Sequence, residues 1–281
     1  MLTTGFDAHF LHGCKRLLMP LLIASILLLT IVPIAFASSH AASLSGPKKY
    51  YLALGDSLAY GYQPNLNFDD GYADDYLVDL KAHGVTSNAN MGCPGETSVT
   101  FLNGKCSGAL LRKYLYLGSQ LNAATHYLRQ HAGQVSPVTL DIGANDVSGD
   151  INTSTCSINV SKFNTDLATV DANLTQTILP ALRDALTVNG QVTGDLLLMN
   201  YYSAYQHLCP ATLSYVQMLN QHLARDISGF GTLIDVFTAF GGPSQPLICS
   251  YTWICSVFKD IHPKDVGYSV IGSAFESTTG Y

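Results

Sequence analysis

Short apolar runs alternate with longer amphipathic stretches from residue 50 to residue 281, and this alternation is the strongest constraint on the fold. Runs typical of buried strands occupy residues 50–54, 85–91, 137–142, 195–202 and 232–236. Helical spacing fills residues 72–82, 109–131, 161–186 and 211–227, and a last helix is predicted after Pro263. Five successive strand–helix units favour a parallel sheet with helices on both faces, so we predict a three-layer α/β/α sandwich.

The first 37 residues have the pattern of a secretory signal peptide. Lys15 and Arg16 precede an apolar run that ends in Ala35-Phe36-Ala37, a small-x-small cleavage site. We expect cleavage after Ala37, a flexible leader over residues 38–49, one domain over residues 50–281, and a secreted protein. The alternative is an uncleaved membrane anchor, because an apolar run of about 20 residues can span a bilayer.

The composition indicates a folded, acidic chain. Hydrophobic residues make up 47% of the sequence and charged residues 12%, which suits a large buried core. Without residues 1–37 the chain holds 12 basic and 19 acidic residues, a net charge of -7. A surface of this sign argues against nucleic acid and against anionic lipid as partners.

Six cysteines remain after removal of the predicted signal peptide, and an even number in an exported chain indicates three disulfides. Six cysteines allow many pairings. We favour the sequential one because its first and last pairs enclose short loops. No C-x-x-C or C-x-x-H spacing supports a metal site. The predicted pairs are Cys93–Cys106, Cys156–Cys209 and Cys249–Cys255.

Residues able to carry chemistry follow three of the predicted strands. Ser57 follows the first strand, Gly92 the second and Asn145 the third. Because ligands of such sheets bind beyond the carboxyl ends of the strands, we expect these residues to share one edge of the sheet. Ser57 can act as a nucleophile only with a base and with donors for an oxyanion. The donors on offer are the N–H groups of Ser57 and Gly92 and the side-chain amide of Asn145, and the candidate base is His262.

Four blocks of this sequence resemble, in order, those of the GDSL, or SGNH, hydrolases. They are "LGDSL" with Ser57, "NMGCPGE" with Gly92, "GAND" with Asn145 and "DIHP" with His262. The resemblance implies a flavodoxin-like fold, an esterase or lipase activity and no cofactor. It also implies Ser57 as nucleophile, His262 as general base, and Ser57, Gly92 and Asn145 as the oxyanion hole. The chain has no G-x-S-x-G, which argues against the α/β-hydrolase architecture.

The last block departs from the family pattern. That pattern places a carboxylate three residues before the histidine, where this chain has Lys259, while Asp260 lies only two before. Three candidates to orient His262 therefore stay open: Asp260, a main-chain carbonyl near Lys259 as in some secreted members of the family, or another acid such as Asp235 or Asp265. We expect Lys259 itself to face solvent, because a cation would oppose a forming imidazolium.

Other conspicuous residues have structural interpretations. We expect Asp56 to order the turn before Ser57 and Asp146 to order its own loop. Tyr201 and Tyr202 are expected in the core and in the pocket wall. Trp253 either lines an acyl pocket or packs in the core.

The sequence therefore predicts a secreted serine esterase or lipase. Its expected partners are small-molecule or lipid esters, and we expect a monomer without a metal, a nucleic acid or, once the signal is cleaved, a membrane span. Two alternatives remain open, a carbohydrate O-acetylesterase and an exported binding module of the same fold without catalysis.

Overall fold

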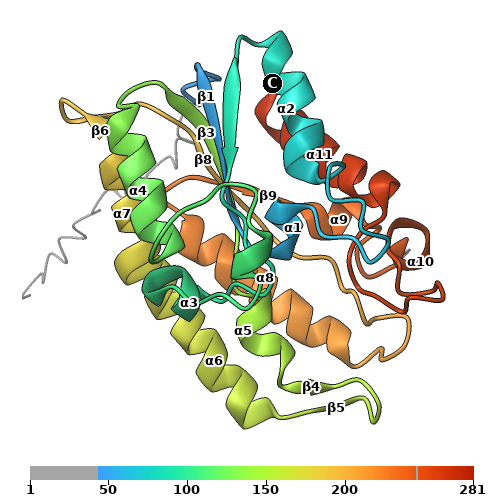
Figure 1. The fold of residues 1–281 in the computed structure, drawn as a ribbon. Helices are drawn as coiled ribbons and strands as arrows, with labels where there is room; N and C mark the ends of the chain where they lie inside the picture. Colours follow the sequence, from blue (N-terminus) through green and yellow to red (C-terminus); the bar gives the residue numbers. More distant parts are fainter. Residues whose placement is uncertain (1–43, 245) are drawn as a thin grey trace, which may run out of the picture. The chain divides into compact units, whose positions relative to one another are not determined.

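A five-stranded parallel sheet forms the centre of the computed structural model, which describes residues 44–244 and 246–281. Its strands are β1 (Tyr50–Gly55), β2 (Ser87–Asn90), β3 (Val135–Asp141), β8 (Leu196–Met199) and β9 (Thr232–Ile234). They lie in the order β2-β1-β3-β8-β9, and every neighbouring pair is parallel (Figure 1). The strand order reverses between β1 and β3, as in flavodoxin-like sheets, whose ligands bind at that point.

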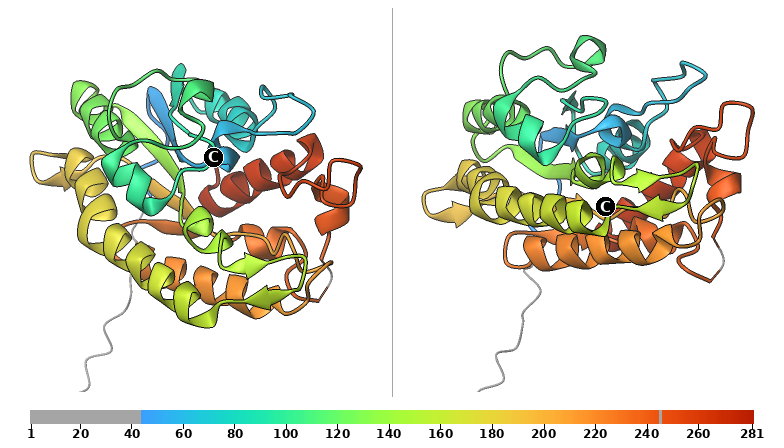
Figure 2. Two further views of the ribbon diagram at one scale, coloured as in Figure 1. Left: turned by 60° about the horizontal axis from the view of Figure 1, so that its bottom comes forward. Right: turned by 90° about the horizontal axis from the view of Figure 1, so that it is seen from below.

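Helices cover both faces of the sheet, which confirms the predicted three-layer α/β/α sandwich (Figures 1 and 2). α2 (Tyr72–Ala82) and α11 (Asp265–Thr279) pack against each other on one side. On the other side lie α4 (Gln120–Gln130), α6 (Val160–Asn173), α7 (Leu179–Ala185) and α8 (Thr212–Ile227). The three central strands, β1, β3 and β8, are rich in apolar residues and almost wholly buried, because helices cover both of their faces, while the edge strands β2 and β9 are partly exposed.

Two of the predicted helices have different bounds in the structure. The helix expected over 109–131 forms only as the short η1 (Ala109–Leu111) and as α4, since Gly118 has a φ of 76° and Ser119 caps α4. The helix expected over 161–186 is continuous but contains a π-helical turn, η2 (Leu174–Ile178). The strands expected over 85–91, 195–202 and 232–236 are shorter than predicted.

Several short elements were not predicted, and most occur where the chain leaves a strand. They include the helices α1 (Ser57–Tyr60), α3 (Ser98–Asn103), α5 (Ala144–Ser148), α9 (Val236–Ala239) and α10 (Ile248–Tyr251). Two small hairpins pair β4 (Ile151–Asn152) with β5 (Ser157–Ile158) and β6 (Thr187–Val188) with β7 (Gln191–Val192). Elements of two to six residues leave too little periodicity to be recognised in a sequence.

The predicted signal peptide and residues 38–43 of the expected leader lie outside the described residues. The rest of that leader is held in place rather than free. The N–H groups of Ser45 and Gly46 donate to the Asp195 carboxylate at 2.6 and 2.9 Å, and the Lys48 N–H donates to the Ser136 carbonyl. No helix among the described residues is long and apolar enough to span a membrane.

All three predicted disulfides are present in the structure, Cys93–Cys106, Cys156–Cys209 and Cys249–Cys255. Cys93–Cys106 and Cys249–Cys255 close short segments that follow β2 and β9, and Cys156–Cys209 joins the turn between β4 and β5 to the segment after β8. They fasten segments that have little secondary structure of their own.

Candidate active site

Ser57 lies at the carboxyl end of β1, as the first residue of α1. Gly55 has a φ of 135°, and a Cβ there would come within 2.2 Å of the Asp141 carbonyl oxygen, so the turn into Ser57 needs a glycine. Asp56 caps α1 by accepting a hydrogen bond from the Leu58 N–H at 2.8 Å. The sharp turn presents the Ser57 hydroxyl at the open edge of the sheet.

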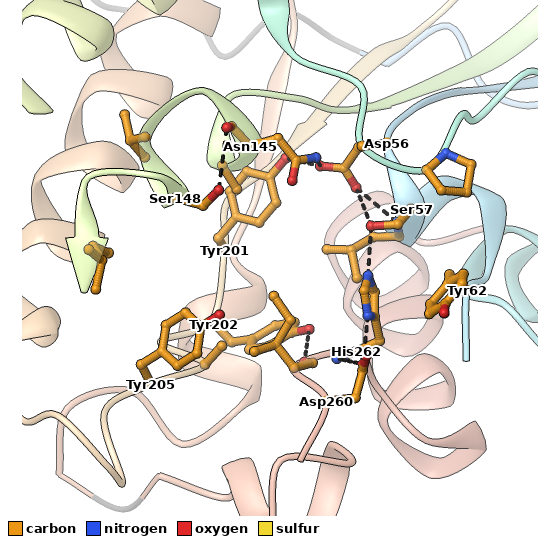
Figure 3. A pocket seen from close by; sticks show the side chains of 18 of the residues that line it. Asp56, Ser57, Tyr62, Asn145, Ser148, Tyr201, Tyr202, Tyr205, Asp260 and His262 are labelled. Atoms are coloured by element: carbon orange, nitrogen blue, oxygen red, sulfur yellow. Dashed lines mark hydrogen bonds and ion pairs between the residues drawn. The ribbon is translucent and has the colours of Figure 1, made fainter. Parts of the chain in front are cut away.

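His262 reaches Ser57 from the loop before α11. Its Nε2 lies 2.8 Å from Ser57 Oγ, although the two residues are 205 positions apart in the sequence (Figure 3). Backbone contacts hold this loop in place. The Trp253 N–H donates to the His262 carbonyl, and Thr252 and Pro263 form an isolated antiparallel β-bridge. The Tyr62 ring packs against the imidazole with a centroid distance of 4.6 Å.

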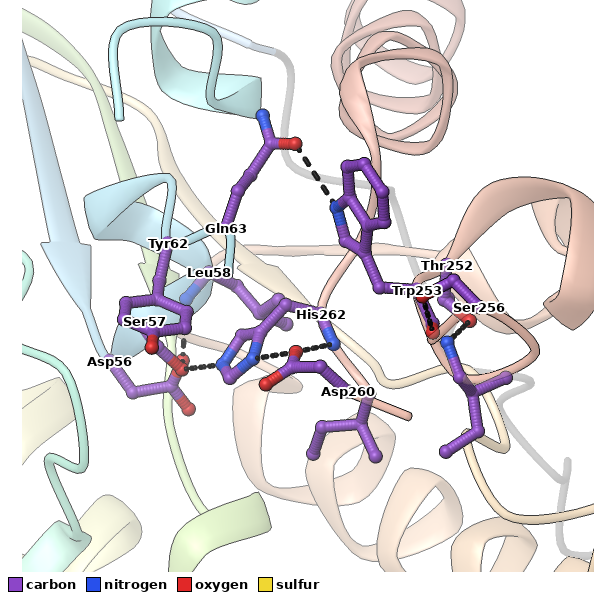
Figure 4. A network of polar contacts seen from close by, with 12 residues as sticks. Asp56, Ser57, Leu58, Tyr62, Gln63, Thr252, Trp253, Ser256, Asp260 and His262 are labelled. Carbon is purple, nitrogen blue, oxygen red and sulfur yellow. Dashed lines mark hydrogen bonds and ion pairs between the residues drawn. The ribbon is translucent and has the colours of Figure 1, made fainter. Parts of the chain in front are cut away.

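Asp260 contacts the imidazole on the side away from Ser57 (Figure 4). Its Oδ1 accepts from the His262 backbone N–H at 2.8 Å and lies 2.7 Å from Nδ1. This arrangement is an Asx turn, in which a carboxylate bonds a group two residues on. This turn therefore brings Asp260 onto the ring, although Asp260 lies only two residues before His262.

The other candidates for orienting His262 are engaged elsewhere. Asp235 caps α9 and accepts from Asn200 at 2.9 Å, and Asp265 accepts from Gln63 at 2.7 Å. Nδ1 has a carboxylate rather than a main-chain carbonyl as its partner, so the carbonyl alternative does not describe this structure. Lys259 is exposed, as expected.

The environment of Asp260 favours its ionised form. Burial alone would raise the pKa of this carboxyl, but the hydrogen bond and charge of the His262 ring and the bond from its backbone N–H outweigh burial. The pKa of Asp260 is therefore below its ordinary value. An ionised carboxylate fixes the proton of a neutral imidazole on Nδ1 and leaves Nε2 free to accept.

Asn145 enters the site from α5, directly after β3. Gly143, with a φ of 114°, makes the turn that starts this helix. The Asn145 side-chain amide donates to the Glu96 carbonyl at 3.0 Å and to Asp56 Oδ2 at 3.2 Å (Figure 3). These two bonds aim the amide at the space beside Ser57.

The structure does not bring Gly92 to the cavity, and Gly95 lies there instead. The Gly92 N–H donates to Asn90 Oδ1 at 3.0 Å, and a Cβ on Gly92 would meet the Tyr60 nitrogen at 2.5 Å. The expectation that Gly92 faces an incoming carbonyl is therefore corrected. The lack of a side chain at Gly92 instead allows close packing against α1.

Gly95 is the third residue of a β-turn, Cys93-Pro94-Gly95-Glu96, closed by the Glu96 N–H donating to the Cys93 carbonyl. Its φ of 78° suits a type II turn, which favours proline and glycine at the two central positions. Within residues 44–244 and 246–281, the N–H groups of Gly95 and Ser57 have no hydrogen-bond acceptor. The Pro-Gly dipeptide was the sequence signal that could have identified Gly95.

Two buried carboxyl groups lie beneath Ser57. The Asp56 N–H donates to Asp141 Oδ1 at 2.9 Å, and the Tyr72 hydroxyl donates to Asp141 Oδ2 at 2.7 Å. Burial raises the pKa of both carboxyls, and the charge of Asp56 raises that of Asp141 further. Asp56 also accepts from the Tyr201 hydroxyl at 3.2 Å, so it joins the serine turn, the Asn145 amide and the pocket wall.

A cavity of about 450 Å³ opens beside the Ser57 hydroxyl. Most of its wall is apolar. Tyr201, Tyr202 and Tyr205 lie on one side of it (Figure 3). Aliphatic side chains complete the apolar part of the wall: Val147, Ile151, Ala204, Val216, Leu219 and Ile261.

Trp253 does not line this cavity. Its indole Nε1 donates to Gln63 at 3.2 Å (Figure 4). Its ring packs edge-on against Phe258. Packing is thus its role, and the acyl-pocket interpretation is wrong. Asp146 also differs from expectation, because it binds the N–H and hydroxyl of Ser98, at the start of α3, rather than its own loop.

A polar network behind the site could not be predicted from the sequence. Gln120, at the start of α4, contacts both the N–H and the carbonyl of Gly55 at 2.6 and 3.0 Å and donates to Glu96 at 2.9 Å. Glu96 in turn offers its carbonyl to Asn145. A lone glutamine in a helix carries no signal of such a role, because only the fold brings it to the serine turn.

Two clusters among the described residues have the composition of metal ligands, but they do not suit a metal. His207 lies with Cys249 and Cys255, and Glu96 lies with Cys93 and Cys106. Each pair of cysteines forms a disulfide and has no thiolate to offer.

Comparisons with known proteins agree with this geometry. The family model described as GDSL-like lipase/acylhydrolase matches residues 53–270. A comparison with curated proteins finds no match.

Solved structures of similar fold include three ester hydrolases. The lipase Lip_vut3 from a goat rumen metagenome is 18% identical, with a TM-score of 0.62 over 83% of this chain and 97% of that one. Axe2, an acetylxylan esterase from Geobacillus stearothermophilus, is 16% identical, with a TM-score of 0.51 over 85% of this chain and 97% of that one. Phospholipase A1 from Streptomyces albidoflavus NA297 is 18% identical, with a TM-score of 0.50 over 82% of this chain and 99% of that one.

Proposed function

Since this chain belongs to the GDSL-like lipase/acylhydrolase family and is a carboxylic ester hydrolase, we propose that it is a secreted serine esterase acting through an acyl-enzyme on Ser57. The observation that carries the proposal is the continuous contact from Ser57 Oγ to His262 Nε2 and from Nδ1 to Asp260, at 2.8 and 2.7 Å. The three disulfides support export, because disulfides persist mainly in oxidising compartments.

In the first step His262 Nε2 takes the proton of the Ser57 hydroxyl while Oγ attacks the ester carbonyl carbon. Asp260 stabilises the imidazolium that forms. The imidazolium then returns a proton to the departing alcohol, and the acyl group stays on Ser57. In the second step water gives a proton to the same imidazole as its oxygen attacks the acyl carbon, and the imidazolium then returns a proton to Ser57 Oγ as the bond from the acyl carbon to Oγ breaks and the acid leaves.

The negative oxygen of each tetrahedral intermediate needs donors that are already in position. We assign this role to the N–H groups of Ser57 and Gly95 and to the Asn145 amide. Ser57 and Gly95 both line the cavity, and neither N–H group has an acceptor among the described residues. The Asn145 amide exchanges its 3.2 Å contact with Asp56 for the oxyanion and keeps the Glu96 carbonyl as its second acceptor.

The cavity favours an apolar acyl group longer than acetyl. Its volume of about 450 Å³ and its wall of aliphatic and tyrosine side chains exceed what an acetyl group fills. This argues for a lipid or aliphatic ester over a carbohydrate O-acetyl ester. The alternative of a binding module without catalysis rested on Lys259, and it loses that support because Asp260 supplies the carboxylate.

A panel of p-nitrophenyl esters of increasing acyl length tests the proposal on the wild-type protein, Ser57→Ala and Asp260→Ala. We expect the highest kcat/KM at intermediate chain length and no turnover above background for Ser57→Ala. Equal activity of the wild type and Ser57→Ala would refute the serine mechanism. A preference for acetyl would instead support the O-acetylesterase.

A further inference from the structure

The segment from Gly104 to Gly118, between α3 and α4, is the most apolar exposed part of the described chain. We propose that this segment docks on the surface of a phospholipid bilayer and so places the mouth of the active-site cavity at the membrane. The docking itself is independent of catalysis, while its use for hydrolysis rests on the proposed function. In the right-hand view of Figure 2 the segment stands out from the layers of the domain.

Three leucines of this segment project almost completely into water. Their exposed fractions are 101% for Leu110, 85% for Leu115 and 96% for Leu117. Leu111 and Tyr114, between them, are also exposed. Isolated exposed leucines are common, but several within eight residues form a patch of the kind that marks an interaction site.

The base of the segment is fixed to the sheet. The exposure of the leucines is therefore not the result of an unstructured loop. The Cys93–Cys106 disulfide fastens its start, and the Gly108 N–H donates to the Pro94 carbonyl at 2.8 Å. Farther along, the Tyr114 N–H donates to the Asn90 carbonyl at 3.1 Å. A rigid loop with an apolar tip loses little conformational entropy on insertion.

The segment is continuous with the cavity. Ser107 and Gly108 form part of the wall of the cavity that Ser57 also lines, and Gly95 packs against Ser107. The exposed leucines therefore begin two residues after a residue of the cavity wall. The acyl chain of a lipid that leaves a bilayer at this point would meet the apolar wall described above.

The charge of the segment differs in sign from that of the whole chain. It contains Lys105, Arg112 and Lys113 and no carboxylate. Arg112 lies over the Tyr116 ring at 4.1 Å, and Lys113 pairs with Asp74 at 3.0 Å, while Lys105 is exposed. Cations next to leucines that insert into a bilayer attract the negatively charged phosphates of the lipid headgroups. The negative net charge of the chain therefore does not exclude anionic lipid as a partner of this part of the surface.

The test compares the wild type with Leu110→Ser/Leu115→Ser/Leu117→Ser by cosedimentation with vesicles of phosphatidylcholine and phosphatidylglycerol. A matched control, Val78→Ser/Val192→Ser, removes exposed aliphatic side chains from α2 and β7. We expect the triple variant to partition at least about tenfold more weakly per leucine removed, and the control to bind like the wild type. Hydrolysis of a soluble short-chain ester should be the same in all three.

Unchanged vesicle binding by the triple variant, or no binding by the wild type, would overturn the proposal. So would a wild-type oligomer in lipid-free solution that the leucine substitutions dissociate, because the segment would then be an interface between copies of this chain. Ser57→Ala separates the two proposals: it should bind vesicles fully and hydrolyse nothing. Vesicle binding by a wild type that hydrolyses no ester would leave docking in place and remove the proposed function.

Discussion

Single residues of the site differ in how far the sequence reveals them. Ser57, Asn145 and His262 stand in short blocks whose chemistry can be recognised, and the structure brings all three to one cavity. The glycine was misplaced because Gly92 and Gly95 share one block, and only the turn geometry separates the glycine that packs from the one that faces the cavity. The contact of Asp260 depends on an Asx turn that the residues alone do not specify.

Asp260→Asn should lower kcat by about 10²–10⁴ while changing KM little, because an amide can leave the imidazole in the wrong tautomer. The control is Lys259→Ala, which removes an exposed neighbour and should keep wild-type turnover. Steady-state kinetics on a soluble ester measure both. An undiminished kcat for Asp260→Asn would mean that another group orients His262.

The pH dependence of the free energy of unfolding provides a second test of Asp260, namely of its ionised state in the folded protein. Its pKa is lowered in the folded protein, so its contribution to the free energy of unfolding is complete above the unfolded value of about 3.9 and is lost as the pH falls through the folded value. Urea unfolding of the wild type and Asp260→Asn should therefore show a difference at neutral pH that disappears in strong acid. A difference that grows on acidification would contradict the ionised assignment.

Asn145→Ala should reduce kcat by about 10²–10³, the usual cost of one oxyanion donor. Ser148→Ala is the matched control, because Ser148 lines the same cavity on the same helix but its hydroxyl donates to the Asn145 carbonyl. Kinetics and thermal unfolding together separate lost chemistry from lost folding. Wild-type turnover in Asn145→Ala would remove the amide from the oxyanion hole.

At the scale of elements, long periodic segments were predictable and short ones were not. α8 begins and ends within one residue of the expected 211–227, because its apolar spacing runs over four turns. The stretch 109–131 also has apolar residues at helical intervals, but Gly118 and the exposed leucines before it belong to a loop. The pairs Cys93–Cys106 and Cys249–Cys255 were predictable because each encloses a short segment, and Cys156–Cys209 is the pair that then remains.

Removal of each disulfide by paired Cys→Ala substitution should destabilise the protein according to the length of chain it encloses. The chain-entropy argument gives about 3 kcal/mol for Cys93–Cys106, with a separation of 13, and about 4 kcal/mol for Cys156–Cys209, with a separation of 53. Urea unfolding measures both losses. The reverse order would show that native contacts, rather than loop closure, decide the effect.

Over the whole molecule, one buried carboxylate fastens both ends of the described chain. Asp195 accepts from the Ser45 and Gly46 N–H groups and from the Tyr281 hydroxyl at 2.6 Å, and it is almost fully buried. The sheet and its layers could be predicted from the alternation of apolar runs. The contacts of Asp195 could not, because Ser45 and Tyr281 lie 150 and 86 positions from it in the sequence and such contacts leave no periodic pattern. It lies at the opposite end of β8 from the cavity side.

Asp195→Ala should cost about 3 kcal/mol of stability, because it removes several hydrogen bonds to a buried charge. Turnover of a soluble ester at low temperature should stay close to that of the wild type. Thermal unfolding and kinetics on the same preparation check the two expectations. Loss of turnover in a protein that is still folded would tie this link to the active site.

The proposed activity depends on the Ser57 hydroxyl and the His262 imidazole acting together as the reacting pair. Labelling with an alkyl fluorophosphonate, followed by mass analysis of the peptides, tests this pair. We expect one phosphonyl group on Ser57 with parallel loss of esterase activity, and very slow labelling of His262→Ala. Labelling at another residue, or full esterase activity in a protein whose Ser57 carries the label, would contradict it.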